Sequence, residues 1–275
     1  LSFPNTIKSE YTDKYEIKTH LEKGSHTLTL FHKKGTFVVD SMLVEPFAER
    51  KSISVIPDAD RTQNGMVSFL AVAPYDGYFK ITASADAAFA VDGAYGATSG
   101  KAATVYLRRG LNYIDFEAPN GIECSIAPTE EKGFSVTVNA DEMRLDGSAF
   151  INESGCVDGI SAESGKASFA VNAPKSGSYR LTLTYSNNDE GGVHAYNVDL
   201  IERFVTLSIN GEAQNIWCRN TYSWDTFKTV TADVELQKGE NIITLSNDGS
   251  TVFNGRTPEA PIIAQITVNE AVKGE

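Results

Sequence analysis

Residues 68–78 read SFLAVAPYDGY, and residues 168–179 repeat the same pattern as SFAVNAPKSGSY. In each copy an apolar run ends at Ala-Pro, a Pro-x-x-Gly step follows, and an aromatic residue then opens the next run. Runs of apolar and β-branched residues separated by Pro and Gly are typical of strands joined by tight turns. A repeat of this kind predicts two related β units in one chain.

The residues that follow the second copy alternate with a period of two. Tyr179, Leu181, Leu183 and Tyr185 share one face, with polar residues between them. A similar alternation ends at Asn-Gly, residues 210–211, a pair that favours a type I′ hairpin turn. No segment keeps a helical period over three turns, so the sequence predicts an all-β fold.

A second repeated element follows each copy. The pattern Leu-x-x-Gly-x-Asn occurs at residues 107–112 and again at 236–241, and a similar hairpin starts at residues 21–24. Together these repeats predict two jelly-roll-like antiparallel β-sandwich modules in tandem. We place them at residues 1–128 and 129–275, because the repeat stops and restarts around the charged stretch 129–133.

The first module has two alternative compositions. Residues 52–128 are too few for the usual number of strands in a sandwich. Either residues 8–44 supply the missing strands, or residues 1–46 are the tail of a preceding, truncated copy. The sequence leaves both alternatives open.

The composition narrows the range of partners. Of the 275 residues 41% are hydrophobic and 22% are charged, as in ordinary globular domains. The formal net charge of −12 argues against nucleic acid, which needs clustered Lys and Arg, and no apolar run is long enough to span a membrane. Three cysteines leave at least one thiol unpaired; we interpret them as small buried hydrophobes, with a Cys156–Cys218 bridge as the alternative.

The second module carries additional loops at residues 186–199 and 218–226, where the first module has short connections. Functional residues concentrate in loops that a rigid scaffold positions. The sequence therefore places the function in the second module.

Residues 134–270 resemble the carbohydrate-binding module families 6 and 35 of bacterial polysaccharide-degrading enzymes. Five motifs carry the resemblance, and their order and spacing matter more than any one of them. They are AD at 140–141, GSYRL at 177–181, VTLSING at 205–211, SWDTF at 223–227 and LQKGEN at 236–241. Residues 52–128 show the same features more faintly.

The resemblance implies a β-sandwich whose loops bind a sugar. Trp224 matches the stacking tryptophan of the families and Asn254 their polar partner, while Tyr196, Asn220 and Tyr222 lie in loops that should converge on the same place. The chemistry agrees, because an aromatic ring covers the apolar face of a pyranose and an amide pairs with its hydroxyls.

Structural roles compete with these assignments. A tryptophan in a sandwich is often a core residue, and we place Trp217 in the core because it ends an alternating strand. Asn254 also suits a turn, and Arg203 suits an ion pair within the module better than a sugar carboxylate.

The resemblance also implies a structural Ca²⁺ between the first and last strands of the module. Asn139 and Asp141 stand at the positions of the expected ligands, but Ala264 replaces an expected aspartate. Ca²⁺ takes several oxygen ligands, so this site has one carboxylate fewer than the families usually supply.

We therefore expect a non-catalytic carbohydrate-binding unit that targets a secreted polysaccharide- or glycoconjugate-degrading enzyme to its substrate. Its partners would be an oligo- or polysaccharide and the catalytic domain of that enzyme, at an extracellular or cell-surface location. The alternatives are a structural or adhesion spacer and a small jelly-roll lyase or glycosidase. The chain shows no paired-carboxylate motif and no hydrolase or metalloprotease motif, which favours the binding unit.

Overall fold

The computed structural model describes residues 24–28, 30, 39, 41–44, 53–63, 65–98, 101–118, 121–193, 198–250 and 258–273. The chain divides into a unit Leu1–Glu49 and a unit Arg50–Glu275. All the strands below belong to the second unit. The hairpin expected at residues 21–24 and most of residues 1–46 lie outside the described residues.

The second unit is built from antiparallel strands. The strands that precede residue 130 are β1 (Val55–Pro57), β2 (Met66–Ala73), β3 (Gly77–Ala83), β4 (Ala88–Val91), β5 (Ala94–Ala97), β6 (Ala102–Leu107), β7 (Gly110–Glu117) and β8 (Cys124–Pro128). The later ones are β9 (Ser135–Asn139), β10 (Arg144–Asp146), β11 (Phe150–Ile151), β12 (Val157–Asp158), β13 (Lys166–Ala173), β14 (Gly177–Ser186), β15 (Glu190–Val193), β16 (Val198–Leu200), β17 (Arg203–Ile209), β18 (Glu212–Cys218), β19 (Lys228–Leu236), β20 (Gly239–Ser246) and β21 (Ile262–Glu270). One 3-10 turn, η1 (Ala140–Glu142), interrupts them. This confirms the predicted all-β, antiparallel fold, and within the described ranges no helix is long and apolar enough to cross a membrane.

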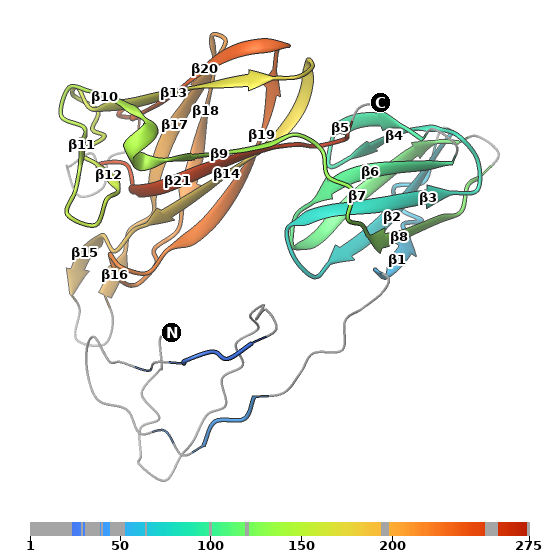
Figure 1. Cartoon of the computed structure of the whole chain (residues 1–275), viewed down its shortest axis with the longest axis horizontal. Helices are drawn as coiled ribbons and strands as arrows, with labels where there is room; N and C mark the ends of the chain where they lie inside the picture. The colour runs from blue at the N-terminus through green and yellow to red at the C-terminus, as the bar shows by residue number, and fades with distance from the viewer. Residues whose placement is uncertain are drawn as a thin grey trace. The chain divides into compact units, whose positions relative to one another are not determined.

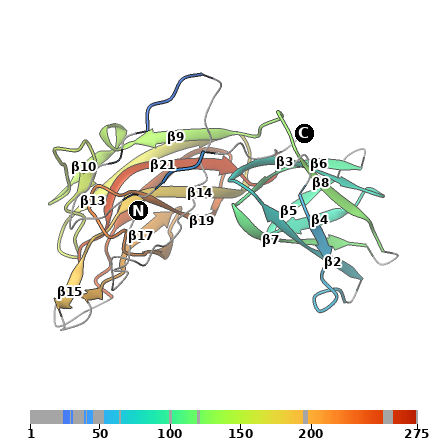
Figure 2. The same ribbon diagram turned by 90° about the horizontal axis from the view of Figure 1, so that it is seen from below.

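The strands form two sandwiches with related topology (Figure 1). In the first, the order β1-β2-β7-β4-β5 makes one sheet and β6-β3-β8 the other. In the second, the orders are β10-β13-β20-β17-β18 and β11-β12-β21-β14-β19, and β9 pairs with β21. Figures 1 and 2 both show β9 running alongside β21.

The sequence repeat corresponds to this topology. β2 and β3, which contain the first copy, occupy the places that β13 and β14 occupy in the second sandwich. Likewise the order β2-β7-β4-β5 matches β13-β20-β17-β18, and β6-β3-β8 matches β19-β14-β21. The two sandwiches therefore share one strand order.

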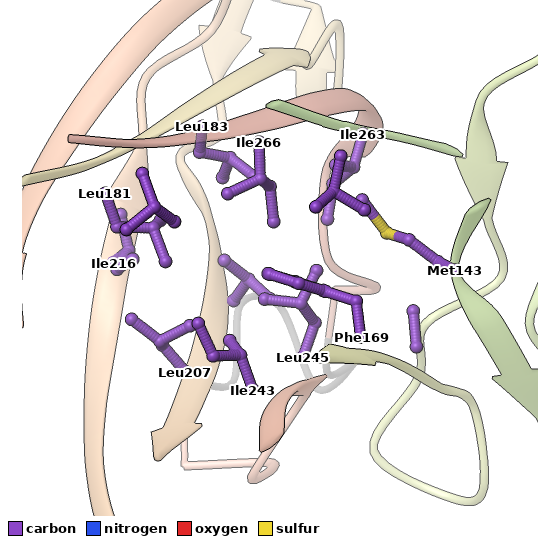
Figure 3. Close-up of a cluster of buried hydrophobic side chains, with 14 of the residues drawn as sticks. Met143, Phe169, Leu181, Leu183, Leu207, Ile216, Ile243, Leu245, Ile263 and Ile266 are labelled. Atoms are coloured by element: carbon purple, nitrogen blue, oxygen red, sulfur yellow. The ribbon is translucent and has the colours of Figure 1, made fainter. Parts of the chain in front are cut away.

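Each sandwich encloses its own hydrophobic core. In the second, Leu181, Leu183 and Ile266 of one sheet point towards Leu207, Ile243 and Leu245 of the other (Figure 3). These residues are the alternating apolar positions of their strands, and all of them are buried. In the first sandwich the equivalent core is lined by the residues Phe69, Phe79, Phe89, Val105, Ile114 and Phe116.

The Leu-x-x-Gly-x-Asn pattern has a structural explanation. Asn241 is fully buried, and its amide nitrogen donates to the carbonyls of Gln237 and Gly239 at 2.8 and 2.9 Å. Asn112 makes the same two bonds in the first sandwich, to Arg108 and Gly110. The glycine is required because its φ is about +100° in both hairpins, a region that favours glycine.

The chain returns to the first sandwich at its C-terminal end. The Tyr106 amide donates to the Ala271 carbonyl at 2.9 Å, and the Lys273 amide donates to the Thr104 carbonyl at 2.9 Å. Val272 forms a bridge with Val105 of β6. These bonds extend the three-stranded sheet of the first sandwich with residues that follow β21. The proposed module boundary near 129–133 stays a prediction.

One core prediction is wrong. Trp217 is 48% exposed, because Ile216 and Cys218 on either side of it point into the core and a strand alternates. It lies on β18, an edge strand, and its ring centroid is 5.5 Å from that of Phe204. The three cysteines are free thiols, two of them buried and Cys124 half-buried.

Candidate functional site

Two segments found in the second sandwich meet at one of its ends. One is the connection from β14 to β17, which contains β15 and β16; the other is the loop 219–227 between β18 and β19, here called the site loop. The Thr221 amide donates to the Asn187 carbonyl at 2.6 Å, and the Asn220 side-chain amide donates to the Asp189 carbonyl at 2.8 Å. The first sandwich joins the equivalent strands through the short segments 84–87 and 98–101.

Asn187 fixes the base of this region. Its side chain is fully buried, and its amide nitrogen donates to the carbonyls of Ile201 and Cys218 at 2.9 and 3.0 Å. Its side-chain oxygen accepts the Asp189 amide at 3.0 Å. Because these partners lie at both ends of the β14–β17 connection and at the end of β18, a single side chain holds these parts of the chain together.

Trp224 is 37% exposed and packs on a buried cation. The guanidinium carbon of Arg203 lies 5.0 Å from the centroid of its ring, within the range of a cation–π contact. Arg203 Nε in turn donates to Asp189 Oδ2 at 3.1 Å, and another of its nitrogens donates to the Ala260 carbonyl at 3.1 Å. The interpretation of Arg203 as an ion-pair residue is therefore confirmed.

Tyr222 is 57% exposed and has an unusual backbone conformation. Its φ is +65°, a left-handed value that residues other than glycine seldom adopt and that costs about 1 kcal/mol or more. Its amide donates to Asn220 Oδ1 at 2.7 Å, which stabilises this conformation. Lys228 Nζ lies 4.9 Å from the ring centroid and also donates to the Asn220 carbonyl at 3.0 Å.

The structure brings together three of the five predicted sugar-binding residues. Trp224 and Tyr222 are exposed on the site loop, while Asn220 is buried beneath it with its side chain bonded to the backbone. Tyr196 and Asn254 lie outside the described residues.

The supporting residues Asn187, Asp189 and Lys228 were not singled out from the sequence. Each is an ordinary polar residue, and its importance comes from partners far away in the chain, such as Asn220, which is 31 residues from Asp189. The clustering of Asn, Asp and Arg beside the loops was the one feature of the sequence that could have drawn attention to them.

The described residues fit a Ca²⁺ poorly. Glu142 Oε2 accepts both the amide and the side-chain nitrogen of Asn139, at 2.7 and 2.9 Å, so these two residues satisfy each other. Asp141 is exposed in η1. Within the described part of the chain, no group of three His, Cys, Asp or Glu residues gathers as a metal site would require.

Comparison with known proteins gives partial likenesses. No family model matches the chain. Among curated proteins, an isomaltosyltransferase of Sporosarcina globispora is 26% identical over 169 residues, which are 61% of this chain and 13% of that protein. The chain thus spans a small part of the length of this relative.

Solved structures match about half of the chain. The family 35 carbohydrate-binding module of Cellvibrio japonicus Abf62 is 26% identical, with a TM-score of 0.39, and the match covers 51% of this chain and 97% of that one. The C-terminal family 6 module of the Zobellia galactanivorans laminarinase LamC is 16% identical, with a TM-score of 0.39, and covers 50% and 100%. These are the two families that the sequence resembles.

Proposed function

We propose that the second sandwich is a non-catalytic carbohydrate-binding module that stacks a sugar ring on Trp224. The observation that carries the proposal is the setting of this ring: Arg203 lies against one face, and the side chain remains 37% exposed. A flat, partly exposed aromatic ring is suited to the apolar C–H face of a pyranose.

The site loop is held in place before any ligand arrives. Thr221 and Asn220 bond the site loop to Asn187 and Asp189. Arg203, which forms a buried ion pair with Asp189, lies against the ring of Trp224. Binding to a loop that is already ordered loses less conformational entropy, so a small contact area can suffice for recognition.

Tyr222 offers a second exposed ring on the same loop. In this proposal it contacts the sugar beside Trp224, while Asn220 acts indirectly by holding Tyr222. Tyr196 and Asn254 remain predicted partners for the ring face and the hydroxyls of the sugar, by family resemblance.

The wider role follows from proximity. A binding module raises the local concentration of a tethered catalytic domain on its substrate. The 26% identity to part of an isomaltosyltransferase supports a parent protein that acts on carbohydrate, and makes isomalto-oligosaccharides the first ligands to test.

The test is a glycan array followed by calorimetric titration of the full chain and of Trp224→Ala. Loss of one stacked ring should remove about 1–3 kcal/mol, or about tenfold to more than a hundredfold in affinity. The folded state should be unchanged, since the ring already lies partly in solvent.

Tyr95→Ala serves as the control, because this tyrosine is 79% exposed on the first sandwich and lies outside the site loop. It should bind like the wild type. Normal binding by Trp224→Ala would refute the stacking role, and failure of the native chain to bind any glycan would favour a spacer instead.

A further inference from the structure

The residues that follow β21 cover an edge of the first sandwich. Val272 bridges Val105 of β6, and the backbone bonds of Ala271 and Lys273 to β6 flank that bridge. β6 is an edge strand of the sheet β6-β3-β8, so residues 271–273 lie along its open side. The unpaired N–H and C=O groups of an edge strand are a template for pairing with a further strand. Here the pairing segment comes from the end of the second sandwich.

The side chains of this segment belong to the core of the first sandwich. Ala271 and Val272 are buried and join the cluster that contains Phe89. Val272 reaches both sheets, because its backbone pairs with β6 while its side chain lies against Gly96 on β5. A Cβ at position 96 would stand 2.6 Å from Val272 Cγ1, which is too close for two carbon atoms. The glycine therefore leaves the space that Val272 fills.

The second sandwich links the corresponding edges with its own residues. There β18 and β19 occupy the places of β5 and β6. Gln214 of β18 donates its side-chain amide to the Asp233 carbonyl of β19 at 2.9 Å. In the first sandwich Val272 makes the link between the two edge strands, so a residue from outside that sandwich does the work of an internal one.

Lys175 holds the same segment from the side of the second sandwich. Its ammonium group donates to the Val272 carbonyl at 2.9 Å and lies 2.8 Å from Glu270 Oε1. Lys175 is the second residue of the Pro-x-x-Gly turn, where the first copy of the repeat has Tyr75. The repeated turn thus carries a cation at this place only in the sandwich that supplies the segment.

We propose that residues 271–273 are a strap with which the second sandwich completes the first. The strap fills the space between β5 and β6, covers the open side of β6 and is tied to Lys175. The first sandwich therefore depends on the second for part of its core, and the two sandwiches are one folding unit instead of independent modules. This inference does not rest on the proposed function.

A double-mutant cycle in the full chain tests the contact. Gly96→Ala should lower the melting temperature, because the new Cβ meets Val272 Cγ1. In a Val272→Ala background that atom is missing, so the same change should cost much less. The approach of the new Cβ to Phe89 Cζ, at 3.1 Å, is the same in both backgrounds and cancels. Coupling of this kind is expected for residues in contact.

Val72→Ala is the matched control for the cycle. Val72 is exposed on β2 of the same sandwich, away from the strap. Gly96→Ala should lower the melting temperature of the Val72→Ala variant as much as that of the wild type, because distant substitutions are additive.

Val272→Asp tests the dependence of one sandwich on the other. It should expel the strap from the core, since an unpaired carboxylate is costly to bury. Hydrogen exchange followed by mass spectrometry should show β3 and β6 exchanging about tenfold faster or more, while β14 and β19 keep their protection. Both tryptophans of the chain lie in the second sandwich, so their fluorescence shows whether that sandwich stays folded. Val72→Asp, the same change at an exposed place, should alter the exchange of β6 much less.

Two results would overturn the inference. One is an equal cost of Gly96→Ala in the wild-type and Val272→Ala backgrounds, which would show that Val272 does not fill the space beside β5. The other is wild-type exchange of β3 and β6 in Val272→Asp, or faster exchange confined to the second sandwich. Neither measurement involves a glycan, so the proposed function stands or fails separately.

Discussion

Arg203 shows how one residue connects the fold to the candidate site. Its side chain and that of Asp189 are 9% and 8% exposed, and their contact is 3.1 Å. The same guanidinium supports the Trp224 ring. Its planar shape suits both tasks, because it can donate along its edge while its face lies against the indole.

We expect Arg203→Met to destabilise the protein and weaken glycan binding together. Removal of Arg203 breaks the buried ion pair with Asp189, and breaking a buried pair costs about 3–5 kcal/mol. Urea unfolding measures the first effect and calorimetric titration the second, and Arg203→Lys should restore part of the stability but less of the binding.

Arg219→Met is the control for this change. Arg219 is 86% exposed and lies 3.6 Å from Glu202, so this surface pair should contribute less than about 1 kcal/mol. Equal losses for the two variants would contradict the assigned role of Arg203.

At the scale of elements, a buried asparagine closes each Leu-x-x-Gly-x-Asn hairpin by bonding its backbone. Asn241→Ala removes donors to two carbonyls and an acceptor for the Gln237 amide, and leaves those groups without their partner. We expect a loss of about 1–3 kcal/mol in the free energy of unfolding, measured by urea titration.

The neighbouring Glu240→Ala should change stability little, since Glu240 is exposed on the same strand. Asn112→Ala should have an effect like that of Asn241→Ala. A negligible effect of Asn241→Ala would show that solvent replaces the lost bonds.

Strand β9 and η1 carry the predicted metal ligands. Because Asn139 and Glu142 bond to each other and Ala264 supplies no carboxylate, we expect EDTA to shift the melting temperature little. A large decrease that Ca²⁺ reverses would show that Asp141 and backbone carbonyls are enough to hold the ion.

At the scale of the whole second unit, the two sandwiches share more than a connecting segment. Arg180 on β14 is 1% exposed and donates to the Val91 carbonyl at 2.7 Å, and it also pairs with Asp233. Tyr78 on β3 donates to the Phe134 and Glu270 carbonyls, at 2.8 and 3.1 Å. Residues 271–273 add backbone bonds to β6.

We expect limited proteolysis to cut first between residues 129 and 133, and the two fragments to stay together. The contacts that Arg180, Tyr78 and residues 271–273 make between the two fragments do not depend on that connection. Mass spectrometry locates the cut, and size-exclusion chromatography tests the association.

A first cut within residues 168–179 would refute the module boundary. Separation of the fragments would show that the contacts between the sandwiches are too weak to hold them. The two outcomes are independent of each other.

The sequence by itself determined the fold class, the repeat and the hairpins, because these depend on local features. Alternation along β14 puts Tyr179 and Leu181 on one face. The glycine of each Leu-x-x-Gly-x-Asn pattern indicates a hairpin turn, and its φ near +100° in the structure confirms the turn. Local sequence also identified Trp224 as a candidate binding residue, since it lies among polar residues and outside any alternating strand pattern.

Only the tertiary structure decided the position of Trp217 and the support of the site. In the run Ile216-Trp217-Cys218 all three residues are apolar, so the sequence does not show which of them face the core. The sheet that β18 joins decides this: Ile216 and Cys218 point into the core and Trp217 points away from it. Asn187 and Thr221 are 34 residues apart in the chain, and Arg180 and Val91 are 89 apart. A polar side chain can bond many partners, and the packing of distant strands selects one.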